Sequence, residues 1–164
     1  MMERSQTDQL CSASANGHLA EVKRFLQNGA HVNGRNEFGR TALQVVKLGC
    51  PTVAKCLLDA GADPDRRDPV YSLTVVHDAA REGFVDMVRV LVNHEADVNL
   101  VDERGNLPLH LAAGEGHTEV VQLLAERTAE PGRRNAEGRN AYDLALGGGK
   151  AATAEWIDYF RNLK

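Results

Sequence analysis

A repeat of about 33 residues constrains this chain more than any other feature. Glycines recur at nearly constant spacing along the chain, at Gly17, Gly49, Gly83, Gly116 and Gly149. A second anchor with the same spacing is the set of alanines Ala30, Ala62, Ala96 and Ala129. A third anchor is the set of glycines Gly39, Gly105 and Gly138, which are separated first by two periods and then by one. Because three anchors share one period, the chain consists of about five repeated units.

Each unit has the pattern turn, helix, glycine, helix, loop. In the fourth unit Pro108 suits a first helical turn, Gly116 suits the end of that helix, and Val120 and Leu124 belong to an apolar stripe. This pattern and period resemble the ankyrin repeat. The sequence therefore predicts an all-α ankyrin-repeat solenoid with projecting β-hairpin-like loops. It forms a single domain, 1–164, with units at about 5–36, 37–68, 69–102, 103–135 and 136–164.

Composition argues against several classes of function. The formal net charge of −4 is too weak to indicate nucleic acid or a membrane surface as the partner. No apolar run approaches the roughly 18 residues of a membrane span, and the segment 1–10 carries no signal core. The odd set Cys11, Cys50 and Cys56 is typical of reduced intracellular thiols.

The sequence offers no catalytic, metal or cofactor site. His77 and His110 occupy the histidine position of the ankyrin unit, where the ring holds neighbouring turns together, and no His and Cys have zinc-ligand spacing. The run 147–150 hints at a phosphate loop, but Leu144 and Ala151 stand where that motif needs glycine and a hydroxyl residue. We therefore expect no cofactor and no enzymatic activity.

The second unit departs from the repeat in length. The interval from Thr41 to Gly49 is one residue shorter than the matching interval from Leu107 to Gly116, so we expect about one turn of helix here instead of two. The next loop gains a residue within 68–73, lacks the turn glycine and should expose Tyr71 and Leu73 to solvent or to a partner. Paired departures of this kind are typical of a functional site, and neutral drift in a loop-tolerant fold is the alternative.

The charge distribution indicates the same region. Residues 69–102 contain six acidic and two basic side chains, a net charge of −4. Asp78 stands where the fourth and fifth units have Leu111 and Leu144, and it should face the concave side. A basic protein partner is the expectation, with an ordinary solvated helix face as the alternative.

Three segments resemble the small ankyrin-type inhibitors of cyclin-dependent kinases four and six: 38–49, 76–86 and 105–113. Five units place the chain nearer the longer members of that family. The resemblance implies a monomer, cytoplasmic and nuclear, that binds the kinase beside the ATP cleft and opposite the cyclin. It would distort both lobes, weaken cyclin D binding and arrest cells in G1.

The resemblance also implies a set of contact residues. Asp78 would pair with a kinase arginine, and Asp68, Thr74 and Asp86 would add polar contacts. The surface of the shortened helix and the segment after Asp78 would supply the rest: Phe38, Gln44, Val46, Lys47, Arg81, Glu82 and Phe84. The loop 69–73 differs from most members, which leaves the preferred kinase open. Two alternatives remain: an ankyrin scaffold with another partner, and an enzyme of unrecognised type.

Overall fold

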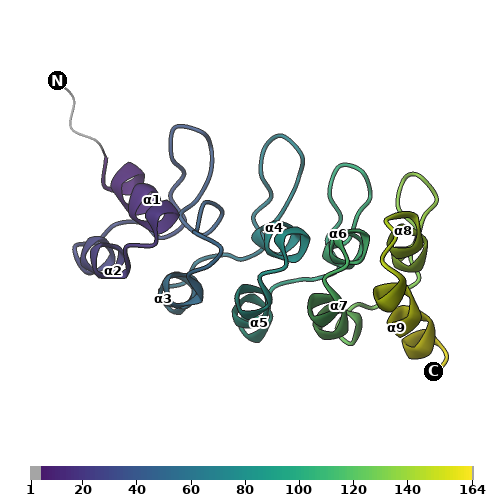
Figure 1. Ribbon diagram of the computed structural model, residues 1–164. Coiled ribbons are helices and arrows are strands. Elements are labelled where there is room, and N and C mark those ends of the chain that lie inside the picture. Colours follow the sequence, from purple (N-terminus) through teal and green to yellow (C-terminus); the bar gives the residue numbers. More distant parts are fainter. Residues whose placement is uncertain (1–4, 164) are drawn as a thin grey trace.

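The computed structural model describes residues 5–163, so residues 1–4 and 164 of the predicted domain lie outside the described part. Within this part the chain forms nine helices and no strand, which confirms the all-α ankyrin solenoid. Figure 1 shows them stacked in a row from the N-terminal to the C-terminal end. No helix in the described residues has the length and apolarity needed to cross a membrane.

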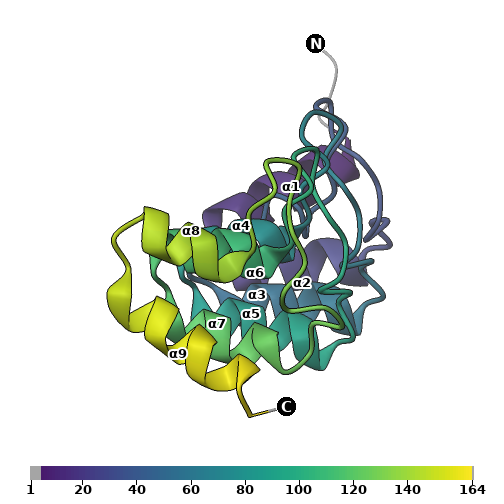
Figure 2. The same ribbon diagram turned by 90° about the vertical axis from the view of Figure 1, so that its right-hand side faces the viewer.

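The helices form two layers. The inner helices are α1 (Gln6–Asn16), α4 (Val75–Glu82), α6 (Pro108–Glu115) and α8 (Ala141–Gly147). The outer helices are α2 (Leu19–Gln27), α3 (Pro51–Asp59), α5 (Val85–Asn93), α7 (Thr118–Ala125) and α9 (Ala151–Arg161). Figure 2, viewed along the row, shows the two layers and the loops that project to one side. We call the side that carries the inner helices and loops the inner face.

A continuous apolar core lies between the layers. Val22, Val53, Leu57, Leu91 and Leu124 are completely buried, one or two from each outer helix as far as α7. Neighbouring inner helices pack closely because Ala79, Ala80, Ala112 and Ala113 are small and fully buried. Burial of this apolar surface against adjacent helix pairs is what stabilises the stack.

The two ankyrin-type histidines connect each inner helix to the next loop. His77 Nδ1 accepts the Thr74 N–H at 3.2 Å, and its Nε2–H donates to the Asn106 carbonyl at 2.9 Å. His110 repeats this arrangement between Leu107 and the Arg133 carbonyl. Both rings are buried, and burial lowers the pKa of each below its ordinary value. The predicted structural role of these histidines is confirmed.

The second unit contains less helix than expected: its missing residue predicts about one helical turn, and the structure has turns but no inner helix between residues 41 and 50. Residues 42–45 form a turn with one α-helical hydrogen bond, from the Val45 N–H to the Thr41 carbonyl at 3.2 Å, and a second turn at 48–49 is closed by the Cys50 N–H and the Lys47 carbonyl at 2.9 Å. Thr41 and Gln44 still form both halves of a capping box, because Gln44 Oε1 accepts the Thr41 N–H at 2.8 Å and Thr41 Oγ1 accepts the Gln44 N–H at 3.3 Å. Gly49 does not take the positive φ of Gly17 or Gly83, because here no inner helix has to end.

The extra residue of the next loop is also where the sequence places it. In the other loops an N–H bonds to the carbonyl four residues later, as from Asn36 to Arg40, whereas Asp68 bonds to Leu73, five residues later. Ser72 occupies the position that Gly39 has in the preceding loop, and it adopts the same left-handed conformation with φ 58°. This conformation strains a residue that has a Cβ atom.

Candidate functional site

The shortened segment opens a hollow on the inner face. Because no inner helix fills the second unit, residues 44–49 face the exposed side of α4 across a space of about 620 Å³. We call this space the broad hollow; from α4 and its C-terminal end it is lined by Asp78, Arg81, Glu82 and Phe84. Seven of the predicted contact residues line it: Gln44, Val46, Lys47, Asp78, Arg81, Glu82 and Phe84.

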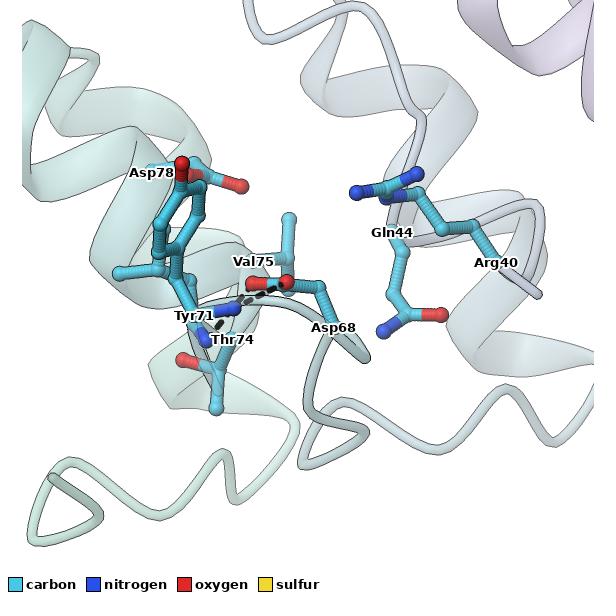
Figure 3. A pocket seen from close by; sticks show the side chains of 8 residues that line it. Arg40, Gln44, Asp68, Tyr71, Thr74, Val75 and Asp78 are labelled. Atoms are coloured by element: carbon cyan, nitrogen blue, oxygen red, sulfur yellow. Dashed lines mark hydrogen bonds between the residues drawn. The ribbon is translucent and has the colours of Figure 1, made fainter. Parts of the chain in front are cut away.

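A second, smaller space adjoins the broad hollow beside the inserted loop. We call it the narrow hollow; it has a volume of about 130 Å³ and is lined by Arg40, Gln44, Asp68, Tyr71, Leu73, Thr74, Val75 and Asp78. Gln44 and Asp78 line both spaces. Figure 3 shows Arg40 and Gln44 on one side of the narrow hollow and Asp68, Tyr71 and Asp78 on the other. The structure therefore brings nine of the eleven predicted residues around two connected spaces.

Two predicted residues lie elsewhere. Phe38 is 65% exposed and lines a separate hollow of about 260 Å³ between α1 and the loop 36–40. Asp86 lies on the outer helix α5, highly exposed, and its carboxylate pairs with Arg89 at 2.8 Å. Neither side chain meets the Asp78 region, so any contact that they make with a partner is separate from it.

Two further predictions need correction because the side chains are buried. Val46, expected on the surface of the shortened helix, is only 5% exposed and belongs to the core. Thr74, expected to make polar contacts with a partner, is also buried, and its hydroxyl accepts the His77 N–H at 3.3 Å to cap α4. Both side chains stabilise the inner face from within, and they leave little side-chain surface that a partner could contact.

Asp78 is the half-buried acid that both hollows share. It lies in the first turn of α4, its side chain is 32% exposed, and its carboxylate pairs with Arg81 Nη2 at 3.1 Å. Burial raises the pKa of Asp78, and the Arg81 guanidinium offsets this effect only in part. Because Arg81 also pairs with Glu82 at 3.3 Å, Asp78 keeps an incompletely compensated charge that a second cation would stabilise.

Asp68 organises the inserted loop. Its carboxylate oxygens accept the N–H groups of Val70, Tyr71 and Leu73, each at 2.8 Å. Burial raises the pKa of Asp68, but these three hydrogen bonds and the nearby Arg40 outweigh burial and lower the pKa below its ordinary value. The carboxylate is therefore ionised near neutral pH, and it fixes a loop that leaves Val70 and Tyr71 more than half exposed.

Sequence reasoning did not include Arg40 and Tyr71 among the contact residues, although both side chains line the narrow hollow. Tyr71 was expected to face solvent or a partner because it lies in the inserted loop, but it was not placed in the set of contact residues. Arg40 directly precedes Thr41, and the fifth unit has an arginine at the same position, Arg139, so its residue type gave no signal.

The predicted absence of a metal site and the glycine run near the C-terminus can be compared with the structure. Among residues 5–163, no three His, Cys, Asp or Glu side chains converge as metal ligands would. The glycines of 147–149 have a packing role at Gly148, where an added Cβ would lie 2.7 Å from the Gly114 carbonyl oxygen. Gly148 thus allows the end of α8 to approach α6, a role unrelated to phosphate binding.

Comparison with known proteins agrees with this geometry. A family model described as ankyrin repeats (3 copies) matches residues 44–135, and a second, described as ankyrin repeats (many copies), matches residues 10–46. Cyclin-dependent kinase 4 inhibitor B of Homo sapiens is 45% identical over 102 residues, 62% of this chain and 74% of that protein. The protein of the same name from Mus musculus is 40% identical over 111 residues, 68% of this chain and 85% of the relative. Cyclin-dependent kinase inhibitor 2A of Homo sapiens is 42% identical over 104 residues, 63% of this chain and 67% of the relative.

Proposed function

Because this chain belongs to the ankyrin-repeat family of cyclin-dependent kinase inhibitors, we propose that it inhibits cyclin-dependent kinases, and specifically kinases four and six. As a member of an inhibitor family it is a regulatory protein and not an enzyme. The proposed contact surface is the inner face of the second and third units, around the broad and narrow hollows. The observation that carries this proposal is the half-buried carboxylate of Asp78 where the two hollows meet.

The chemistry of this surface favours a basic partner. Asp78, Asp68 and Glu82 supply negative charge, and the partial burial of Asp78 reduces the screening of its charge by water. When a kinase arginine reaches Asp78, the contact becomes a charge-assisted hydrogen bond that is further shielded from solvent. The free protein has already removed part of the hydration of Asp78, so forming this contact has a smaller desolvation cost than burying a fully hydrated carboxylate. The contact therefore contributes more than an exposed ion pair does.

The proposed mechanism is a shift between kinase conformations. The inhibitor binds beside the ATP cleft, opposite the cyclin, contacts both lobes and favours the arrangement in which they are misaligned. A ligand that prefers this conformer lowers the affinity for any ligand that needs the other one, so cyclin D binding weakens without direct overlap. The protein acts as a monomer in the cytoplasm and nucleus, and the expected cellular result is arrest in G1.

The test is binding of purified kinase to the wild-type protein and to Asp78→Asn. We expect the substitution to weaken binding at least about 30-fold, the lower range for truncating one partner of a buried interfacial charge pair. The thermal melt followed by circular dichroism should hardly change. Asp158→Asn is the matched control, because Asp158 forms an ion pair with Arg161 at the same i,i+3 spacing on α9.

Two outcomes would contradict the proposal in different ways. If the wild-type protein binds neither kinase, the partner is wrong and an ankyrin scaffold for another protein is the better description. If the kinase binds but Asp78→Asn collapses the melt, Asp78 has a structural role and the contact assignment is wrong.

A further inference from the structure

Tyr71 is held at the edge of the narrow hollow by hydrogen bonds of both its backbone N–H and its backbone carbonyl. Its N–H donates to the Asp68 carboxylate at 2.8 Å, and its carbonyl accepts the Glu103 N–H of the next loop at 2.9 Å. The following residue, Ser72, is held in the left-handed conformation with φ 58°. The side chain of Tyr71 nevertheless remains 58% exposed. The loop therefore uses strain and three Asp68 hydrogen bonds to present an aromatic ring without burying it.

The preceding loop presents an aromatic ring at the same place. Phe38 directly precedes Gly39 as Tyr71 directly precedes Ser72, and Gly39 and Ser72 share the left-handed conformation. At this position the fourth and fifth units have Arg104 and Glu137 instead. Among the four loops of this kind within residues 5–163, exposed aromatic rings thus occur at this position in the two units whose lengths deviate from the repeat.

Gln44 supplies an independent sign that the narrow hollow receives a ligand. Its Oε1 accepts the Thr41 N–H at 2.8 Å, which fixes the orientation of the amide group. Its Nε2 is buried and has no hydrogen-bond partner within the described chain. Figure 3 shows this nitrogen on the side of the amide that faces Asp68 across the hollow. Because a buried donor without an acceptor is unfavourable, a carbonyl from a partner would supply a hydrogen bond that the free protein lacks.

The charges around the narrow hollow favour a cation beside Tyr71. Asp78 and Tyr71 line one side together, with Asp68 below them, and Arg40 lies on the opposite side (Figure 3). A guanidinium suits this pair of neighbours better than an ammonium, since its flat face stacks on an aromatic ring while its edge binds a carboxylate.

We propose that Tyr71 is a contact residue that selects an arginine of the kinase. In this arrangement the Tyr71 ring and the Asp78 carboxylate bracket one guanidinium, and Gln44 Nε2 donates to a main-chain carbonyl of the same kinase segment. The inference rests on the proposed function, and it adds to that function a residue and a hydrogen bond that determine which segment fits.

The first experiment measures the affinity of the full-length chain for purified kinase after changes at Tyr71. Tyr71→Phe keeps the aromatic face and should stay within about 2-fold of wild type. Tyr71→Leu keeps apolar bulk without the ring and should weaken binding roughly 2- to 30-fold, the range of a cation–π contact. Tyr159→Leu is the matched control, because Tyr159 on α9 is 62% exposed and distant in the stack, and it should have no effect.

The second experiment asks whether Gln44→Glu strengthens or weakens the binding of purified kinase. The new carboxylate still accepts the Thr41 N–H, but the N–H₂ donor becomes an acceptor. Because the new charge is buried and faces Asp68, the thermal midpoint should fall, so affinity is measured at a temperature at which circular dichroism shows the variant to be folded. Added negative charge alone would strengthen the binding of a cation, whereas loss of the donor to a carbonyl should weaken it about 10-fold or more. Stronger binding of Gln44→Glu would therefore overturn the proposed hydrogen bond.

The outcomes separate this inference from the proposed function. If the wild-type chain and Tyr71→Leu bind the kinase equally well, the role of Tyr71 is refuted while kinase binding stands. If Tyr71→Phe and Tyr71→Leu weaken binding equally, the hydroxyl acts instead of the ring face, and the cation–π arrangement is wrong. Absence of binding by the wild-type chain overturns both proposals.

Discussion

Gly83→Ala tests whether contacts between neighbouring units, rather than helices alone, hold the inner face in shape. Gly83 ends α4 with φ 80°, a left-handed conformation that disfavours alanine by roughly 1–2 kcal/mol. An added Cβ would also lie 2.5 Å from the His117 ring, which must then move. Movement breaks the hydrogen bond from His117 Nε2 to the Arg81 carbonyl at 2.9 Å, a further loss of about 0.5–1.5 kcal/mol.

The chain contains a matched control for the backbone part of this effect. Gly149 is the same glycine of the last unit, with φ 71°, but an added Cβ meets nothing within 4 Å. Both substitutions gain about 0.4–1 kcal/mol from a less flexible unfolded chain. We expect Gly83→Ala to lower the free energy of unfolding by about 1–3 kcal/mol, and by about 1 kcal/mol more than Gly149→Ala.

Urea unfolding followed by far-ultraviolet circular dichroism measures this difference. Because Gly83 lies between Glu82 and Phe84, the same substitution should also disturb the broad hollow and weaken kinase binding. Equal losses of stability for the two alanine variants would show that the His117 contact contributes nothing beyond the strain of the glycine conformation. The reasoning about contacts between units would then be refuted.

Two further predictions concern pH and local opening. Burial lowers the pKa of His77 and His110, so below about pH 6.5 the unfolded chain binds more protons than the folded chain. The stability that these two buried, neutral histidines contribute should be fully present above that pH and should fall as the pH drops. A urea midpoint that stays unchanged between about pH 7.5 and 5.5 would contradict this. Amides of 44–47 should exchange with deuterium faster than those of 111–114 in α6. The segment 44–47 contains one α-helical hydrogen bond, and its other N–H groups bond individually to the Thr41 hydroxyl, the Leu43 carbonyl and the Ser14 carbonyl instead of forming a helical ladder. Comparable protection of the two segments would refute the expectation.

The sequence predicted those features that depend on counting residues. The period located the glycines that follow inner helices, and Gly17, Gly83, Gly116 and Gly149 all have positive φ. The single missing residue before Gly49 predicted that this inner helix would be shortened, although not that it would be absent, and the extra residue within 68–73 predicted the wider loop. Length determines these features because a helix or a turn cannot absorb one residue without changing its hydrogen bonds.

The same reasoning failed where orientation depends on the helix that is absent. Val46 was placed on the surface as though the segment were helical, but without the second turn its side chain points into the core. The hydroxyl of Thr74 looked available for a partner, although a capping bond to the His77 N–H uses it. Ser72 shows a third limit, because a serine gives no warning that the loop holds it in a glycine conformation.

The lost helix raises the question of what satisfies the backbone of the second unit, since unpaired buried N–H and carbonyl groups are strongly unfavourable. Ser14 of α1 supplies the answer, for it is completely buried and bonds to the irregular segment twice. Its carbonyl accepts the Lys47 N–H at 3.1 Å, and its hydroxyl donates to the Ala42 carbonyl at 2.6 Å. The first unit therefore replaces hydrogen bonds that a second helical turn would have formed. These two hydrogen bonds keep the stack continuous although the second helical turn is missing. The space that this turn would have filled stays open, and it is the broad hollow beside Asp78.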